Sequence, residues 1–307
     1  MTTKKITNLN DKSRRPHFLS VDVEDYFMVE AFSAVVDRRD WDNWESRVVS
    51  NTQTTLDLLD RYHATATFFF VGWVAKKFPR LVREVQTRGH ELACHSYWHR
   101  TVYSLSPDEF RADTREAVGA IEDAGGVKVR GYRAPSWSIT KNCLWALDVL
   151  AEEGFAYDSS IYPIRHDLYG LPNAKRFPYE HMCRNGRLLD EIPPASINIL
   201  GQTLPGAGGG YLRIFPLSYT RWVFKIFEED YEESVVVYFH PWELDPNQPR
   251  IRGALKSRLR HYTNLGRMSS RLECLLADYS FRPLGAAFPP KETDCQRRVD
   301  YKEGNKQ

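Results

Sequence analysis

The sequence predicts an α/β fold, a closed or nearly closed (β/α) barrel of about seven parallel strands. From residue 17 onward, short β-branched or aromatic segments alternate with longer helical patterns. About seven such strand candidates precede residue 240, too regular a series for two unrelated domains. We therefore expect one domain over residues 17–287, preceded by a polar segment at 1–16.

Four strand–helix pairs make up the expected first half of this barrel. The strands are predicted at HFLSVDV, TATFFFV, HELACHS and VRGYRAPS, which are residues 17–23, 65–71, 90–96 and 129–136. The helices that follow them are predicted at 54–63, 76–89, 106–126 and 141–154. Glycines stand where three of these helices would end, at Gly89, Gly125 and Gly154.

The second half of the chain is less regular. Strand residues are expected within 187–199 and at SVVVYFH, 234–240, with a helix over 218–230. The run Gly208–Gly210 lacks the GxxxxGK[ST] pattern of a phosphate loop, so a flexible turn is expected there. A C-terminal extension with a basic helical segment begins at about residue 246, and residues 288–307 are polar enough to be a disordered tail.

Composition excludes several classes of protein. The formal charge of the 307 residues is +2 and the basic residues are scattered, which predicts neither nucleic-acid binding nor a polybasic membrane anchor. No apolar segment is long enough to be an integral membrane helix, and the N-terminus lacks the apolar core of a signal peptide. Five cysteines without CxxC spacing argue against a disulfide framework and a zinc finger. We therefore expect a cytoplasmic protein with free thiols.

Titratable side chains follow several predicted strands at a similar point. The first strand ends in SVDVED, the third in CHSYWH, the fourth in YRAPSW and the last in YFHPWE. Because the carboxyl ends of parallel barrel strands meet at one face, these groups are expected to converge. The sequence therefore predicts a site for chemistry at that face.

Two histidines and a carboxylate in these segments are candidate metal ligands. His95 and His99 would converge if the backbone turned helically, although pairs at this spacing also arise by chance. Together with one carboxylate they would leave open positions for water and substrate, as hydrolytic metal sites require. Such a ligand set favours Zn²⁺ without excluding other divalent ions.

The carboxylate ligand is expected to be Glu24 or Asp25. If the first strand stays extended, Glu24 points to the same face as Asp22, because side chains alternate with period two. If the strand breaks before Tyr26, Asp25 can swing in instead. We prefer Asp25, since the shorter side chain would hold a metal more rigidly.

Three further residues are candidates for catalysis. Asp22 could be the general base toward water and His240 the acid that protonates the leaving group, while Arg133 could keep the base ionised. Each has a structural alternative: a turn or helix-capping aspartate, a satisfied histidine at a strand end, and a structural ion pair. Likewise, Trp137 and Trp242 could be sugar platforms or simply packing residues.

Five motifs in order carry a resemblance to a known family: SVDVED, HSYWH, RAPSW, EIPPASI and YFHPWE, within about residues 17–245. The chain resembles the NodB-homology polysaccharide deacetylases, carbohydrate esterase family 4, and specifically the branch associated with exosortase and exopolysaccharide gene clusters. The resemblance implies a distorted barrel that removes acetyl groups from N-acetylated hexosamines with a divalent metal.

The resemblance also implies roles for residues. His95 and His99 correspond to metal ligands, Asp22 to the base, Arg133 to the group that tunes it and His240 to the acid. Most family members have adjacent aspartates where this chain has Asp22, Glu24 and Asp25, so the carboxylate ligand stays open.

For the substrate, an acetylated saccharide, we expect a backbone N–H between Tyr132 and Ala134 to stabilise the oxyanion, and Tyr132, Trp98, Trp137 and Trp242 to contact sugar. A related hydrolase of a small cyclic amide or ureide is one alternative. A carbohydrate-binding protein without activity is another, which intact motifs argue against. The sequence does not predict an oligomeric state.

Overall fold

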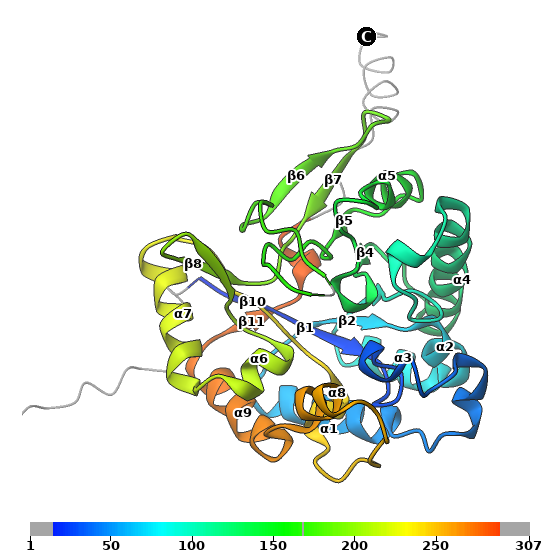
Figure 1. Cartoon of the computed structure of the whole chain (residues 1–307), viewed down its shortest axis with the longest axis horizontal. Coiled ribbons are helices and arrows are strands. Elements are labelled where there is room, and N and C mark those ends of the chain that lie inside the picture. Colours follow the sequence, from blue (N-terminus) through cyan, green and yellow to red (C-terminus); the bar gives the residue numbers. More distant parts are fainter. Residues whose placement is uncertain (1–14, 168, 289–307) are drawn as a thin grey trace, which may run out of the picture.

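A computed structural model describes residues 15–167 and 169–288 of the chain. Its strands and helices alternate over most of the sequence, and the helices pack outside a curled sheet (Figure 1). The strands are β1 (His17–Val23), β2 (Thr67–Phe70), β3 (Glu91–Cys94), β4 (Gly131–Tyr132), β5 (Tyr157–Asp158), β6 (Tyr179–Met182), β7 (Leu188–Glu191), β8 (Ser196–Ile199), β9 (Gln202–Pro205), β10 (Val236–Phe239) and β11 (Phe281–Arg282). The helices are α1 (Val48–Arg61), α2 (Gly72–Lys77), α3 (Pro79–Thr87), α4 (Pro107–Gly125), α5 (Trp145–Glu152), α6 (Gly209–Ile214), α7 (Leu217–Glu229), α8 (Leu255–Tyr262) and α9 (Met268–Asp278).

The main sheet has the order β10-β1-β2-β3-β4-β5-β7-β6, and β11 also pairs with β1. The seven strands from β10 to β7 are mutually parallel, and β6 is antiparallel to β7. After β7 the backbone N–H of Ala195 donates to the carbonyl of Val236 on β10 at 3.2 Å, which nearly closes the barrel. The predicted fold class, a distorted barrel of about seven parallel strands, is confirmed.

The central strands are buried on both faces. All seven residues of β1 and all four of β2 are buried, as expected for parallel strands covered by helices. The register pairs Ser20 with Tyr238 on one side and with Thr67 on the other. β1 therefore lies in the interior of the sheet, and its C-terminal end lies between those of β2 and β10.

The helix α4 begins and ends largely as its sequence predicts. Ser106 accepts a hydrogen bond from the backbone N–H of Glu109, whose carboxylate returns one to the backbone N–H of Ser106. The helix ends at Gly126, whose φ of 70° favours glycine, and not at Gly125, which is still helical.

In the second half, one expectation is confirmed and one is corrected. The segment 187–199 contains two strands, β7 and β8, separated by Pro193 and Pro194, which cannot donate backbone hydrogen bonds. The glycine run is packed and is not a free turn: a Cβ at Gly208, where φ is 131°, would lie 2.3 Å from Cδ1 of Tyr238. Of the predicted tail, all but residue 288 lies outside the described residues.

No helix within residues 15–167 and 169–288 combines the length and apolar character that crossing a bilayer requires.

Candidate active site

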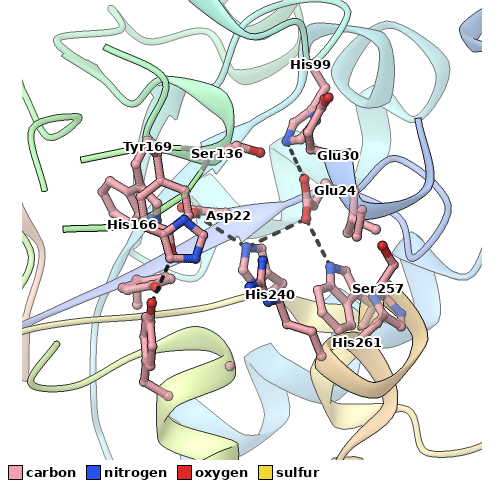
Figure 2. Close-up of a pocket in the computed structure, with 18 of the residues that line it drawn as sticks. Asp22, Glu24, Glu30, His99, Ser136, His166, Tyr169, His240, Ser257 and His261 are labelled. Carbon is pink, nitrogen blue, oxygen red and sulfur yellow. Dashed lines mark hydrogen bonds and ion pairs between the residues drawn. The ribbon is translucent and has the colours of Figure 1, made fainter. Parts of the chain in front are cut away.

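A pocket of about 560 Å³ opens at the C-terminal ends of the parallel strands. Its volume is in the usual range of small-molecule sites. Figure 2 shows Asp22 and Glu24 at the end of β1, with His240 after β10 and His99 after β3 around them. The pocket is also lined by His95, Trp137 and Trp242. The structure thus brings together the strand-end residues that the sequence singles out.

Glu24, His95 and His99 form a cluster that could hold a metal ion. One ligand atom from each residue lies within 4.8 Å of the others, and all three side chains are buried. His99 Nε2 lies 2.5 Å from Glu24 Oε2. His95 Nδ1 lies 2.7 Å from the carbonyl of Arg133, a contact that orients the ring and leaves Nε2 for the pocket. A buried carboxylate with two imidazoles fits a divalent cation.

The preference for Asp25 as the carboxylate ligand is not supported by this geometry. Asp25 accepts hydrogen bonds from the Ser46 hydroxyl at 2.7 Å and from the backbone N–H groups of Arg47 and Val48 at 3.0 and 3.2 Å. It therefore holds the N-terminus of α1 and points away from the histidines. β1 stays extended to Val23, so Glu24 shares the face of Asp22, as strand alternation requires.

The two histidines converge by a different route from the one expected. Residues 95–100 are not helical, and positive φ values of 65° at Ser96 and 50° at His99 bend the chain instead. Asp113 on α4 stabilises this loop, because it accepts hydrogen bonds from the Ser96 hydroxyl at 2.6 Å and the Tyr97 backbone N–H at 2.7 Å. Left-handed non-glycine residues are strained and cluster at functional sites.

Asp22 and Arg133 form a buried ion pair beside this cluster. Arg133 Nη1 donates to Asp22 Oδ1 at 2.7 Å and to the Ser20 hydroxyl at the same distance. Its other nitrogens donate to the carbonyl and hydroxyl of Ser159. Because Arg133 fixes one oxygen of Asp22, only Oδ2 is directed toward His240, whose Nε2 is 3.8 Å away.

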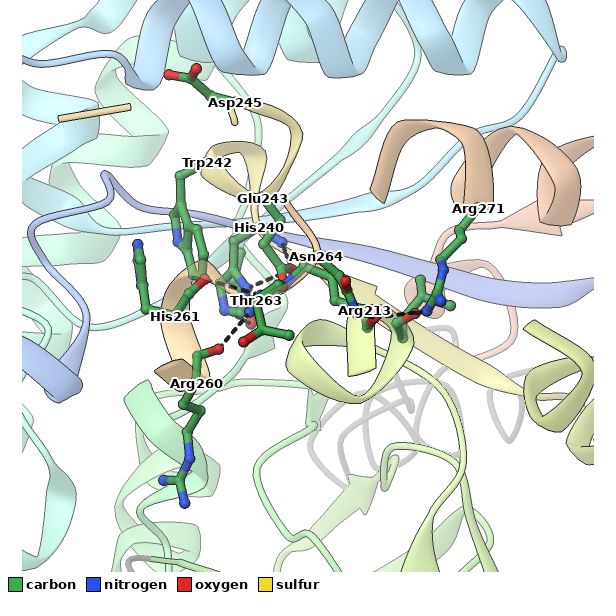
Figure 3. Close-up of polar contacts among 12 residues, drawn as sticks. Arg213, His240, Trp242, Glu243, Asp245, Arg260, His261, Thr263, Asn264 and Arg271 are labelled. Atoms are coloured by element: carbon green, nitrogen blue, oxygen red, sulfur yellow. Dashed lines mark hydrogen bonds and ion pairs between the residues drawn. The ribbon is translucent and has the colours of Figure 1, made fainter. Parts of the chain in front are cut away.

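His240 is oriented by a chain of buried charges (Figure 3). Its Nδ1 lies 3.1 Å from Glu243 Oε2, and Arg213 Nε donates to the other oxygen of Glu243 at 2.6 Å. Arg213 also donates to the carbonyls of His261 and Thr263 at 3.0 and 2.6 Å. The Nε2 of His240 is therefore the nitrogen that faces the pocket, 3.6 Å from Glu24 Oε1.

These contacts shift the pKa values of the site. Burial alone would lower the pKa of His240, but the carboxylates of Glu24 and Glu243 raise it to about 9. Burial likewise acts to raise the pKa of Glu24, yet the nearby histidines hold it well below its usual range. Burial lowers the pKa of His95 to about 4, which favours the neutral imidazole that binds metals.

The two tryptophans expected to contact sugar, Trp242 and Trp137, have different environments. Trp242 lies between the rings of His240 and His261, with centroid distances of 5.1 and 4.1 Å, and its indole N–H donates to Glu24 Oε1 at 3.1 Å. Its faces are thus covered, which argues against a sugar platform. Trp137 lines the pocket and contacts Arg133 through its ring.

Two predicted substrate contacts are corrected. Tyr132 is buried behind the pocket, where its ring packs edge-on against Phe110 and Phe155. Trp98 packs against Tyr97 and Trp41 and does not line the pocket.

The expected oxyanion donors are already paired within the protein. The backbone N–H of Arg133 donates to the carbonyl of Cys94 at 2.9 Å, and that of Ala134 donates to the Ser160 hydroxyl at 2.8 Å. Neither is free to bind an oxyanion unless these bonds break.

A buried carboxyl pair lies behind Ala134. Asp158 accepts a hydrogen bond from the Ser160 hydroxyl at 2.5 Å, and Glu191 accepts one from the backbone N–H of Ile161 at 3.0 Å. Burial raises the pKa of Asp158 to about 6, and burial with the neighbouring Asp158 raises that of Glu191 well above its usual range. Ser160 also accepts a hydrogen bond from the backbone N–H of Ala134, so the pair supports the segment that carries Arg133.

Several of these residues were not expected from the sequence. Glu243 follows His240 by three residues in HPWE, a spacing that could have indicated a partner. Arg213 and Asp113 lie far from their partners in sequence, and no local pattern marks them.

Two family models match parts of the chain. Residues 41–155 match the family model described as polysaccharide deacetylase, and residues 159–288 match a domain of unknown function, DUF3473. A peptidoglycan-N-acetylglucosamine deacetylase of Bacillus cereus is 31% identical over 161 residues, 47% of this chain and 57% of that protein. A bifunctional xylanase/deacetylase of Pseudobutyrivibrio xylanivorans is 32% identical over 101 residues, 33% of this chain and 17% of that protein. The chain spans less than two thirds of the length of either relative.

Solved structures share the fold. A Mycobacterium smegmatis protein described as a polysaccharide deacetylase superposes with a TM-score of 0.56 at 19% identity, covering 93% of this chain and 90% of that one. Puue allantoinase superposes with a TM-score of 0.55 at 14% identity, covering 95% of this chain and 100% of that one. Residues 41–155 are therefore similar in sequence to polysaccharide deacetylases, and the chain shares the fold of these two solved structures. Its site is divided among three regions: Asp22 and Glu24 precede the two matched segments, the histidine pair and Arg133 lie in the first, and His240 lies in the second.

Proposed function

We propose that the protein is a divalent-metal-dependent hydrolase that removes acetyl groups from N-acetylated hexosamines of a polysaccharide or its precursor. The match of residues 41–155 to the polysaccharide deacetylase model supports deacetylation of acetylated sugars. The observation that carries the finer proposal is the juxtaposition, in one pocket, of the Glu24, His95 and His99 cluster with Asp22 and His240.

The residues around the pocket would divide the work of amide hydrolysis. A cation held by Glu24, His95 and His99 would supply Lewis-acid activation of water and of the acetamide carbonyl. Asp22 would accept the proton of the attacking water through Oδ2, since Arg133 occupies Oδ1.

His240 is placed to protonate the departing sugar amine. Its Nε2 faces the pocket while Glu243 and Arg213 fix the opposite side of the ring. The proton that His240 gives to the amine would leave from Nε2, the ring nitrogen closest to Asp22. One proton taken from water by Asp22 and one given to the amine by His240 leave the proton count of the site unchanged.

The metal is proposed to be Zn²⁺, because two imidazoles and one carboxylate are a common zinc ligand set. The association with exosortase and exopolysaccharide gene clusters and the cytoplasmic location remain predictions from the sequence.

The test is acetate release from a panel of acetylated saccharides, including N-acetylglucosamine oligomers, after chelation and after re-addition of single metals. We expect release that is lost with the chelator and restored by zinc. Turnover of a cyclic ureide without acetate release from any sugar would favour the alternative hydrolase. Acetate release that survives exhaustive chelation would rule out the metal.

A further inference from the structure

Helix α8 at the rim of the pocket exposes an apolar strip. Leu255 and Leu259 are 69% and 59% exposed, and their spacing of four residues places them on one side of the helix. The other side is buried: His261 stacks on Trp242 and contacts Phe32 edge-on. Single exposed leucines are ordinary, but two on one helix face suggest a binding surface.

An additional apolar side chain lies beside this strip. Val35 is 51% exposed, and its Cγ2 lies 4.0 Å from the position that a Cβ on Gly253 would occupy, just before α8 begins. The apolar surface therefore extends from α8 toward the loop after β1.

Positive charge surrounds the leucines. Between residues 246 and 272 the sequence contains no Asp or Glu and seven basic residues, Arg250, Arg252, Lys256, Arg258, Arg260, Arg267 and Arg271. At 100° per residue, Lys256 and Arg260 flank the leucines on one side and Arg258 flanks them on the other. The Asp167 carboxylate forms an ion pair with Lys256 Nζ at 2.7 Å and lies 3.8 Å from Arg260 Nη2. It therefore neutralises only part of this positive charge.

The charge and polarity of this surface argue against two other binding partners. A second copy docked on the same face by two-fold symmetry would bring like charges together. A soluble polyanion would pair with the cations but leave the leucines in water.

We propose that α8, with Val35, docks on the surface of an anionic lipid bilayer. Leucines at the centre would enter the headgroup region while the flanking cations contact anionic headgroups, as in interfacial amphipathic helices. The sequence predicts a basic helical segment after about residue 246, but the surface forms only when residues 250–260 fold beside the pocket.

Docking would place the pocket at the membrane. Lys256, Ser257, Arg260 and His261 of α8 all line the pocket, and Figure 2 shows Ser257 and His261 close to His240. The saccharide offered to the site would then be attached to a lipid carrier. This last step rests on the proposed function, whereas the docking itself does not.

The experiment is co-sedimentation of the full chain with vesicles of phosphatidylcholine, with and without phosphatidylglycerol, at low and high salt. We expect binding that requires the anionic lipid and weakens with salt. Leu255→Ser with Leu259→Ser should lower the partition coefficient at least about tenfold. Arg252→Gln with Arg258→Gln should lower it by about fivefold for each arginine.

Matched controls separate the surface from general effects. Met182→Ser removes a side chain that is 65% exposed on β6, at the opposite end of the molecule from α8 in Figure 1. Arg80→Gln removes an exposed cation of α3. Both should bind vesicles as the unchanged protein does, and so should Asp22→Asn, which tests catalysis alone.

Two results would overturn the proposal. One is vesicle binding that is absent or equal in the α8 variants and the controls. The other is a dimer in solution that the leucine substitutions convert to monomer, which would assign this face to a second copy of the chain.

Discussion

The two sides of the candidate active site are stabilised by different contacts. At the ends of β1 and β3, backbone groups and neighbouring strands fix Glu24 and His95: alternation along the strand places Glu24, and the carbonyl of Arg133 orients His95. After β10, a chain of buried charges through Glu243 and Arg213 fixes His240. On the second side, removing Arg213 or Glu243 should therefore cost stability, because it leaves the other buried charge uncompensated.

The largest expected effect tests the side of the site that would bind the metal. Glu24→Gln should remove most metal binding and with it hydrolysis, because a ligand carboxylate is lost. Asp25→Asn should leave metal affinity nearly unchanged and lower the free energy of unfolding by about 1–2 kcal/mol, since it weakens the contacts that hold α1. Metal dissociation constants and unfolding curves for both variants check this. A greater loss of metal affinity in Asp25→Asn would restore Asp25 as the ligand.

The next effect concerns proton transfer with the metal retained. Asp22→Asn keeps the shape of the side chain but cannot accept a proton, so turnover should fall by about 10²–10⁴-fold. His240→Ala should cost a similar factor, and most for poor leaving groups. Turnover and metal content are measured on the same samples. Near-normal turnover in both variants would show that the base and acid are other residues.

The charge chain behind His240 should respond more in stability than in metal binding. Arg213→Met leaves Glu243 buried without its partner and should lower the free energy of unfolding by about 3–5 kcal/mol. Arg213→Met combined with Glu243→Leu removes both charges and should recover much of that loss, while turnover stays low because His240 is no longer oriented. Chemical denaturation and turnover of the two variants test this. Equal destabilisation in the single and double variants would argue against a buried ion pair.

The smallest effect is a pH dependence of the free energy of unfolding that Asp158 causes. Burial raises the pKa of Asp158 to about 6, so the folded protein keeps a proton that the unfolded chain releases near pH 4. Stability from this group is complete below about pH 4 and is lost as the pH rises through about 6, a loss of about 3 kcal/mol.

Asp158→Asn should make the decrease in unfolding free energy between pH 4 and pH 7 smaller by about that amount. Asp230→Asn, which removes an exposed carboxylate after α7, is the matched control. An unchanged pH dependence in Asp158→Asn would mean that Asp158 is already ionised near pH 4 in the folded protein.

The sequence predicted strands better than the contacts at their ends. β1 falls at the predicted residues 17–23, because a run of buried β-branched and aromatic side chains is visible locally. The choice between Glu24 and Asp25 depended on where the chain turns after β1, and that is decided by the N-terminus of α1, more than twenty residues later.

The chain of charges behind His240 could not be predicted from the sequence for a similar reason. Arg213 lies thirty residues before Glu243, and an arginine gives no local sign that it will be buried. Tyr132 was misplaced because it immediately precedes Arg133, and neighbouring residues of a strand point to opposite faces.

The pairing of β1 with β10 has a consequence for the order of folding. Asp22 and Glu24 are near the start of the chain, yet β10, which covers one side of their strand, begins only at Val236. Closing a loop of this length costs conformational entropy before any contact compensates for it, and ribosomes release the N-terminal strand first. Until the last third of the protein is synthesised, β1 has an unpaired edge, and Asp22 and His240 cannot meet. The pocket therefore forms late, when the two ends of the sequence come together.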